Sequence, residues 1–287
     1  MPAPPIRAWF EDPILDAIVL TCDKYRALTE HMVFQYDRLW PDHRFRFLIP
    51  FQHDRGPDSR KCKFVRTDPS IRQTVLTLLR DFDDEDWVYW AIDDKYPIML
   101  DVPKIKTLER WLETQQSING VLFCRCRKLN KQKYLNSIII HDQESNKYLG
   151  RNGYEQIWLH QLIRVKILRR LFQAFPEVIN CPKDMDALKK LPNVPVADLL
   201  FVRDDTLAIF GESTHRGVLT SNCSESILKY KLRLPMWFQQ TTCTRIILGE
   251  EEFWRSQNRS LAWFARARAA LSGGTWLRQA LTGASDA

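Results

Sequence analysis

The sequence has no uninterrupted hydrophobic run of the roughly 18 residues that a membrane-spanning helix requires. Its seven cysteines are odd in number and irregularly spaced, which argues against a disulfide framework. The one close pair, Cys124 and Cys126, has no second pair and no clustered histidine with which to form a zinc site. Because no charged-then-apolar leader opens the chain, we expect a reduced, cytoplasmic protein whose contact with a membrane is at most peripheral, at its inner face.

Internal repeats and low-complexity segments are also absent, and the composition argues against a long disordered chain. The 287 residues are 45% hydrophobic and 27% charged, close to the average of globular proteins. This length predicts one large domain or two closely packed halves. The net charge of +7 favours an anionic partner, such as a nucleotide, a nucleic acid or an acidic lipid surface.

The first 50 residues predict a strand, a helix and a second strand. Residues 17–20 are a wholly apolar run that stops at Thr21-Cys22-Asp23, as a strand buried on both faces would. Apolar residues then recur at helical spacing over residues 25–39, with Asp23 as the expected helix cap. Residues 45–49 predict a second short strand, so the segment predicts a βαβ unit.

The following segment predicts a loop and a helix. Residues 52–63 are polar and predict a loop at the carboxyl edge of the sheet, where open α/β sheets bind ligands. Asp68-Pro69 predicts a helix cap followed by proline at the first helical position. An apolar stripe over residues 71–82 indicates the helix itself, which ends at an acidic turn over residues 83–86.

Two adjacent carboxylates at the end of a buried strand are the most informative feature. Residues 87–92 are six β-prone apolar or aromatic residues that run directly into Asp93-Asp94-Lys95. Adjacent carboxylates repel each other unless a cation or hydrogen-bond donors neutralise them. Mg²⁺ or Mn²⁺ would do so and would keep positions open for phosphate oxygens. The alternative interpretation is a solvated turn at the strand end, where Asp is common.

Regular strand–helix alternation ends after a predicted helix over residues 102–115. Two further apolar runs, at residues 121–123 and 138–140, predict short strands. The apolar positions between Glu155 and Phe175 predict one long helix with basic residues on its other faces. Two more helices, rich in Trp, Phe and Arg, are predicted over residues 250–271 and 276–281.

The chain resembles the nucleotide-sugar-dependent glycosyltransferases of the GT-A fold over about its first 115 residues. The residues that carry the resemblance are Thr21-Cys22-Asp23 with Tyr25-Arg26, Trp40-Pro41-Asp42, and the run Trp87-Val88-Tyr89-Trp90-Ala91-Ile92-Asp93-Asp94. The resemblance implies a Rossmann-like α/β fold, with a mixed, mainly parallel sheet flanked by helices and a C-terminal helical tail. It also implies a hexosyltransferase that moves a sugar from a nucleoside-diphosphate sugar to a hydroxyl of a glycan or lipid-linked acceptor.

The resemblance also assigns the binding residues. Thr21, Asp23 and Arg26 become candidates for nucleotide contact, and Asp93 for contact with the nucleotide or the metal. Asp94 becomes the expected ligand of a divalent metal, Mn²⁺ or Mg²⁺, although this chain has adjacent acids where the family has D-x-D.

The loop at residues 211–217 and two acids supply the remaining candidates. Some enzymes of the family add a histidine to the metal shell, which makes His215 a candidate ligand, and the neighbouring Arg216 could meet the diphosphate. In such enzymes the base often lies near the start of a helix in the acceptor half, so the resemblance makes Glu155, at the start of the predicted long helix, the expected catalytic base and Asp142 the second candidate. The competing interpretation of Glu155 is a carboxylate that only complements a helix dipole.

The resemblance divides the chain into a donor-binding half over residues 10–116, an acceptor-binding half over residues 117–248 and a basic helical tail over residues 249–287. Much of the positive charge belongs to the predicted long helix and to the tail. We therefore expect an anionic acceptor or a membrane surface, contacted peripherally through the tail, and do not expect a nucleic acid partner.

Two competing functions remain open. Asp93 and Lys95 also match the D-x-K half of the signature of metal-dependent nucleases, with Pro57-Asp58 available upstream. Against this, Tyr96-Pro97 follows at once, whereas such sites place the Asp and the Lys on one face of a strand. The third interpretation is a non-enzymatic, basic protein that binds a membrane surface or a partner through its C-terminal helices.

Overall fold

The computed structural model describes residues 14–124, 139–142, 146–188, 198–203, 207–215, 218–233 and 247–248. Arg216, Cys126 and the predicted tail helices lie outside these residues. Within them, no helix has both the length and the apolar character needed to cross a membrane.

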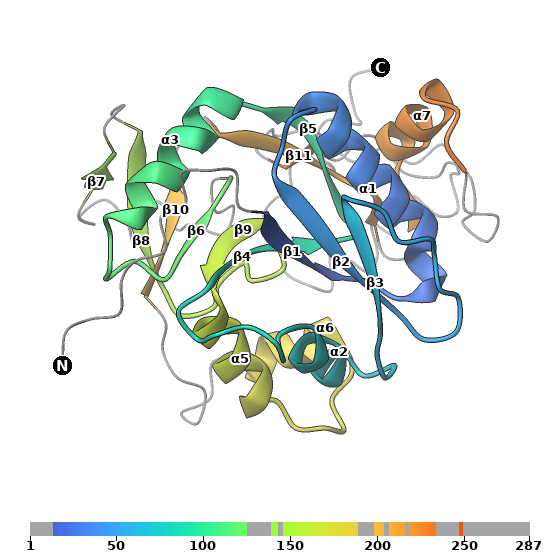
Figure 1. Cartoon of the computed structure of the whole chain (residues 1–287), viewed down its shortest axis with the longest axis horizontal. Coiled ribbons are helices and arrows are strands. Elements are labelled where there is room, and N and C mark those ends of the chain that lie inside the picture. The colour runs from blue at the N-terminus through green and yellow to red at the C-terminus, as the bar shows by residue number, and fades with distance from the viewer. Residues whose placement is uncertain are drawn as a thin grey trace, which may run out of the picture.

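A nine-stranded sheet forms the centre of the molecule (Figure 1). The strands in spatial order are β3 (Cys62–Arg66), β2 (Phe45–Phe51), β1 (Leu15–Leu20), β4 (Trp87–Ile92), β9 (Gln161–Arg164), β6 (Gly120–Leu122), β10 (Asp198–Val202), β8 (Lys147–Asn152) and β7 (Ile139–His141). The strand pairings make β9 and β8 antiparallel to the other seven strands. The prediction of an α/β fold with a mixed, mainly parallel sheet is therefore confirmed.

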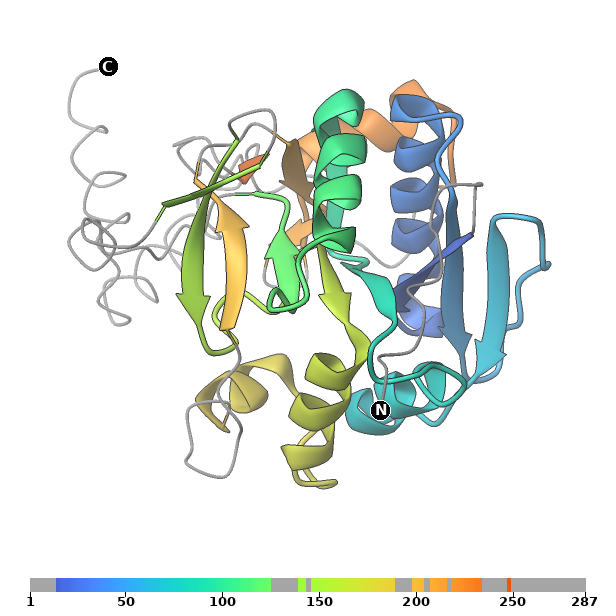
Figure 2. The ribbon, with the colours of Figure 1, turned by 60° about the vertical axis from the view of Figure 1, so that its left-hand side comes forward.

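Helices cover both faces of this sheet, as Figures 1 and 2 show. One face carries α1 (Arg26–Leu39), α3 (Val102–Glu113) and α7 (Ser221–Lys229), and the other carries α2 (Ile71–Leu78), α5 (Val165–Ala174) and α6 (Pro182–Leu188). Successive residues of β1 point to opposite faces, so Ala17 and Val19 enter one core and Ile18 the other. This two-sided burial is why β4 and residues 17–20 of β1 are continuous apolar runs in the sequence.

Two small sheets join segments that are far apart in the sequence. Strand β5 (Lys95–Leu100) pairs with β11 (Ala208–Glu212), which also pairs with β14 (Ile247–Leu248). Strand β12 (Thr214–His215) pairs with β13 (Val218–Leu219). The sequence did not predict β5, because polar residues and Pro97 interrupt its apolar pattern. The pairing of β5 with β11 places residues 208–212 beside residues 95–100.

Three local details in the first 80 residues differ from the sequence prediction. The predicted loop at residues 52–63 is confirmed over residues 52–61, but the edge strand β3 that follows was missed, because it is only partly buried and therefore has no apolar run. Helix α2 is capped by Ser70, whose side chain accepts the Gln73 N–H, and not by Asp68. Asp23 does not cap α1, because it begins a short 3₁₀ helix and its carboxylate binds elsewhere.

The predicted long helix over residues 155–175 is also wrong. The chain instead forms a turn, then strand β9, then helix α5. Leu162 and Ile163 are buried on opposite faces of the sheet, which a short apolar run cannot distinguish from helical burial. Strand β9 fills the gap between β4 and β6, and this tertiary requirement overrides the local helical pattern.

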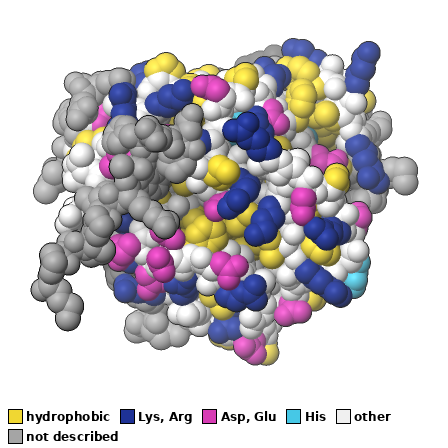
Figure 3. All heavy atoms as spheres, viewed as in Figure 1, with side chains coloured by type: hydrophobic (Ala, Val, Ile, Leu, Met, Phe, Trp, Pro, Cys, Tyr) yellow, Lys and Arg dark blue, Asp and Glu magenta, His cyan; other side chains and the backbone are white. Residues whose placement is uncertain are grey.

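The basic residues around α5 are held by the acidic turn that precedes β4. Lys166 Nζ lies 2.9 Å from each carboxylate oxygen of Glu85, Arg164 donates to the Glu85 carbonyl, and Arg169 pairs with Asp84. Basic and acidic side chains are interspersed over the face shown in Figure 3. The positive charge near α5 is therefore largely matched within the protein, which weakens it as an argument for an anionic partner.

Candidate active site

Thr21 and Asp93 meet where the order of the sheet reverses. From β1 the chain passes to β2 and β3 on one side, and β4 then returns to the other side of β1. Leu20 and Ile92 are partners in the parallel register, so the next residues, Thr21 and Asp93, leave the sheet side by side. Such a switch point at the carboxyl edge is where open α/β sheets bind ligands.

A chain of hydroxyl groups ends on the Asp93 carboxylate. Thr29 Oγ1, on α1, donates to Thr21 Oγ1 over 2.9 Å, and Thr21 Oγ1 donates to Asp93 Oδ2 over 2.6 Å. Burial, together with the neighbouring charge of Asp94, raises the pKa of Asp93 to about 7, against the opposing effects of Thr21 and Lys95. Asp93 therefore carries an unfavourable negative charge at neutral pH unless a cation joins it.

Only one of the two oxygens of the Asp94 carboxylate has a partner among the described residues. Its Oδ2 lies 2.8 Å from Nζ of the buried Lys95, whereas its Oδ1 is buried with no hydrogen-bond partner among the described residues. Burial would lower the pKa of Lys95, but the carboxylates of Asp94 and Glu212 outweigh it and raise that pKa. Lys95 thus remains an ammonium ion that fixes one oxygen of Asp94 and leaves the other available.

The backbone of the β11–β12 segment also reaches Asp94. The Ser213 N–H donates to the Asp94 carbonyl over 2.7 Å, and the Thr220 hydroxyl donates to the Glu212 carbonyl over 2.6 Å. His215 follows in β12, with its backbone two residues beyond Ser213. The structure thus brings the backbone of the segment that contains His215 to Asp94, and the role of His215 as a metal ligand stays a prediction.

The acid pair suits a hard divalent cation. Mg²⁺ is commonly bound by one or two carboxylates, with waters and substrate phosphates completing the shell. The unpartnered Oδ1 of Asp94 and the pKa of Asp93, which burial and then the charge of Asp94 raise, fit such an ion. In the part of the chain that the structure describes, no group of three or more His, Cys, Asp or Glu side chains could hold a metal, so the remaining ligands would come from water or substrate.

Asp23 and Arg26 are occupied within the protein. The Asp23 carboxylate accepts the backbone N–H groups of Gln52, His53 and Asp54 over 2.7 to 3.2 Å. Arg26 donates to the Asp54 carbonyl over 2.8 Å. Burial would raise the pKa of Asp23, but these N–H donors and Arg26 outweigh it and lower that pKa. Both residues therefore fasten the loop after β2 beside the switch point, a role that the sequence did not predict.

We expect Asp23→Ala to lower the free energy of unfolding by about 2 kcal/mol, because three backbone N–H groups lose a charged acceptor. Urea unfolding at pH 7 measures this loss. Asp54→Ala is the matched control, since it removes an exposed carboxylate and keeps the backbone groups of the loop, and it should change stability by less than about 0.5 kcal/mol. Unchanged stability in Asp23→Ala would contradict the fastening role.

Glu155 lies in a turn that other elements fix in place. The Ile157 carbonyl accepts the indole N–H of Trp90, from β4, over 2.7 Å. Arg151 donates to the Glu155 carbonyl over 2.7 Å, and Gln156 adopts a left-handed backbone conformation with φ of 57°. Such strain of about 1–2 kcal/mol persists only where the surroundings impose it. The predicted helix start is wrong, yet the turn meets the carboxyl end of β4, where Asp93 follows.

Asp142 lies far from this site. It follows β7, which is five strands from β4, a separation of about 24 Å at the usual strand spacing. Its carboxylate accepts hydrogen bonds from the backbone and side chain of Asn146 and from the Tyr148 hydroxyl, over 2.8 to 2.9 Å. The structure thus brings together Thr21, Asp93 and Asp94, but not Asp142.

Sequence reasoning missed the structural partners of the acids, namely Thr29, Ser213, Glu212 and the pairing role of Lys95. Lys95 was considered only as part of a D-x-K motif. Thr29 lies eight residues after Thr21, and Ser213 and Glu212 lie more than 100 residues from Asp94. Nothing in the local sequence signals such contacts, because they depend on how β5 and β11 pair.

Comparisons with known proteins give similarities of fold. No family model and no curated protein matches the sequence. Among solved structures, the galactosyltransferase LgtC with donor and acceptor sugar analogues is 14% identical, over 64% of this chain and 67% of that chain, with a TM-score of 0.36. The 2-C-methyl-D-erythritol 4-phosphate cytidylyltransferase of Thermus thermophilus is 13% identical, over 77% and 100%, with a TM-score of 0.44. An S. aureus TarS fragment is 12% identical, over 68% and 60%, with a TM-score of 0.42.

All three TM-scores are below 0.5. At this identity the similarity concerns the fold alone, and the function proposed below is argued from the site.

Proposed function

We propose that the protein is a glycosyltransferase that moves a sugar from a nucleoside-diphosphate sugar to an acceptor hydroxyl. The observation that carries the proposal is the acid pair Asp93-Asp94 beside Thr21 at the switch point of the sheet, with an unpartnered oxygen on Asp94. Two adjacent carboxylates that need a cation, at the edge where nucleotides bind in α/β folds, suit a diphosphate-bearing substrate.

The chain's own residues prepare the donor site. When bound, Mn²⁺ or Mg²⁺ offsets the negative charge that develops on the leaving diphosphate. Asp94 Oδ1 and Asp93 would hold the ion, while Lys95 keeps Asp94 oriented and Thr21 keeps Asp93 oriented. His215 and Arg216 remain proposed contacts to the metal and the diphosphate.

The nucleoside would lie beside the loop after β2. Asp23 and Arg26 hold this loop from inside, so we propose that they contribute to nucleotide binding mainly by shaping it. Tyr25 follows Asp23 in the chain, and burial and the charge of Asp93 raise the pKa of its hydroxyl. A neutral, half-buried aromatic ring in this position suits packing against a base.

We propose Glu155 as the base that takes the proton of the acceptor hydroxyl. A general base must come within about 3 Å of that proton's oxygen, so it must share the edge of the sheet with the donor. The Glu155 turn meets the end of β4, whereas Asp142 belongs to the other margin of the sheet. The acceptor remains proposed as a glycan or a lipid-linked glycan, with peripheral membrane contact through residues 249–287.

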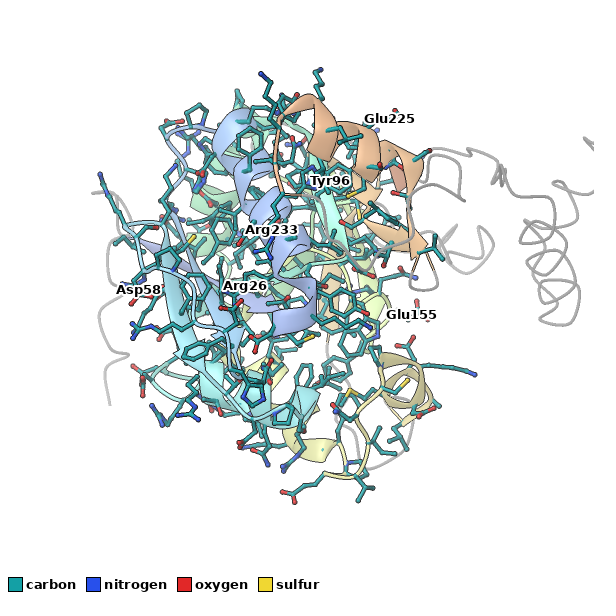
Figure 4. All side chains as sticks on the ribbon, turned by 90° about the vertical axis from the view of Figure 1, so that its right-hand side faces the viewer. Arg26, Asp58, Tyr96, Glu155, Glu225 and Arg233 are labelled. Carbon is teal, nitrogen blue, oxygen red and sulfur yellow. The ribbon has the colours of Figure 1, made fainter. Side chains whose placement is uncertain are left out.

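The geometry favours this function over the nuclease. The Asp58 carboxylate accepts hydrogen bonds from the Phe64 N–H and from Arg55, and Figure 4 shows Asp58 at the outer margin, away from Arg26 and Glu155. Lys95 begins strand β5, whereas Asp93 lies in the turn before it. The interaction-protein alternative depends on the tail, which lies outside the described residues.

A nucleotide panel tests the proposal. We expect UDP, GDP or dTDP to bind with a dissociation constant below about 100 μM in the presence of Mn²⁺, measured by calorimetry, and at least one matching sugar donor to be hydrolysed slowly. Absence of binding by every diphosphate, with and without metal, would contradict the proposal. Release of pyrophosphate from a nucleoside triphosphate and a sugar phosphate would instead indicate a nucleotidyltransferase, and metal-dependent cleavage of plasmid DNA would indicate the nuclease.

A further inference from the structure

A buried histidine lies directly behind the acid pair. Strand β9 runs antiparallel to β4, and its first residue, Gln161, pairs with Trp90. His160 precedes Gln161 in the chain and lies outside the strand. The last residue of β4, Ile92, therefore has no backbone partner in β9. The fully buried ring of His160 takes this position instead, with Nε2 at 3.2 Å from Ile92 N and 3.0 Å from Ile92 O.

The other ring nitrogen is anchored in the core. His160 Nδ1 lies 2.7 Å from the Tyr36 hydroxyl, which lies 2.6 Å from the Tyr89 hydroxyl. All three side chains are fully buried. Burial lowers the pKa of His160 to about 3, so the ring is neutral and carries a single N–H. Its tautomer is set by its neighbours, and in either tautomer both nitrogens have a partner.

This arrangement joins the core to the site. Tyr36 comes from α1 and Tyr89 from β4, and the His160 ring also packs 4.8 Å, between ring centroids, from Phe210 of β11. The ring thus touches the end of β4, which continues into Asp93, and the strand that precedes Ser213, whose N–H binds the Asp94 carbonyl. Strand β4, which leads into Asp93, and strand β11, which leads to Ser213, therefore both contact the ring of His160.

We infer that His160 is a positioning residue, which fixes the backbone of Ile92 and thereby the direction in which Asp93 and Asp94 present their carboxylates. The effect of His160 on catalysis rests on the proposed function, whereas its effect on the backbone of Ile92 can be tested without that function. An error of about 1 Å in the placement of a metal-binding or catalytic group is enough to cost orders of magnitude in rate.

Two substitutions separate the two ring nitrogens. The amide of Gln in His160→Gln can reach the position of Nε2 and hold Ile92, whereas the shorter amide in His160→Asn can reach only the position of Nδ1 and hold Tyr36. We expect His160→Asn to speed hydrogen exchange of the Asp93 and Asp94 amides at least tenfold and to weaken binding of UDP with Mn²⁺ at least tenfold. His160→Gln should stay within about threefold of wild type in both measurements.

His31→Asn is the matched control. His31 is also fully buried and neutral, because burial lowers its pKa to about 4, but it bonds to Ser226 and Gln35, and its ring packs 4.6 Å, between centroids, from Tyr96 of β5. We expect this variant to lose stability without changing exchange at Asp93. If His160 only stabilised the fold, His160→Asn would behave like His31→Asn. It would lose stability and leave exchange at Asp93 unchanged.

The outcomes are decisive. Equal effects of His160→Asn and His160→Gln, or faster exchange at Asp93 in His31→Asn, would overturn the inference. If His160→Asn does not fold, Tyr36→Phe releases Nδ1 and should speed exchange at Asp93 about threefold, while no change would overturn the inference. If wild type binds no UDP with Mn²⁺, the proposed function loses support while amide exchange still decides the positioning role.

Discussion

Asp94→Asn should reduce the rate of sugar transfer, or of donor hydrolysis, at least about 10³-fold, which corresponds to about 4 kcal/mol of lost transition-state stabilisation. The physical reason is that Asp94 combines the free, buried oxygen Oδ1 with an orientation that Lys95 imposes through Oδ2. An amide in its place offers one neutral oxygen, which binds a hard cation far more weakly than a carboxylate. Steady-state kinetics with the donor found in the nucleotide panel measures the effect.

Asp81→Asn provides the control for this prediction. This variant makes the same Asp-to-Asn substitution at an exposed carboxylate. Asp81 precedes β4, whereas Asp94 follows it at the other end of the strand, so the rate should be unchanged. Asp94→Asn also leaves the buried Lys95 with less negative charge, so a fall in melting temperature of a few degrees is expected. A rate within about tenfold of wild type in folded Asp94→Asn would refute a metal-binding role for Asp94.

Asp93→Asn should stabilise the metal-free protein at neutral and alkaline pH, by up to about 4 kcal/mol. Burial raises the pKa of Asp93 to about 7, whereas the unfolded chain has the ordinary value near 4. Between these two pH values the folded state binds more protons than the unfolded state, so its stability falls as pH rises. Below about pH 4 the carboxyl is protonated in both states and the penalty disappears.

The measurement is the difference in free energy of unfolding between Asp93→Asn and wild type, from urea titrations with chelator at several pH values. This difference should be near zero at pH 4, should grow up to about pH 7 and should then level off. Burial lowers the pKa values of His31 and His160, so these residues make the free energy of unfolding decrease as pH falls. This contribution has the opposite sign to that of Asp93. It is the same in both proteins and therefore cancels in the difference. A difference that does not change with pH would contradict a buried, charged Asp93. Added Mn²⁺ should stabilise wild type more than the variant.

The sequence predicted the central part of the fold well, for a physical reason. Strand β4 is buried on both faces and is apolar throughout, β1 is apolar from Ala17 to Leu20, and α1 and α3 each bury one stripe against the sheet. Local pattern and tertiary environment agree in these elements. They disagree in β3, β5 and β9, where an exposed edge, an internal proline or a short apolar run hides the strand.

Part of the candidate site could also be predicted. Thr21 and Asp93 both follow buried strands, and parallel neighbouring strands end at one edge of a sheet, so their meeting needed only the correct strand order. Asp23 and Arg26 were predicted to contact a nucleotide, which stays a prediction, whereas their hydrogen bonds to the loop after β2 were not predicted. Asp142 follows a correctly predicted strand, yet that strand lies at the other margin of the sheet.

By itself, the sequence determined the fold class, the strands that meet at the switch point and the two acids that follow one of them, because each is written in a local pattern of burial or charge. Only the tertiary structure decided which oxygen of Asp94 is free, that Lys95 and Thr21 orient the acids, and that His160 lies behind them. The Thr21–Asp93 and His160–Ile92 contacts join residues 72 and 68 positions apart, and they follow from strand order and register, which no local pattern contains.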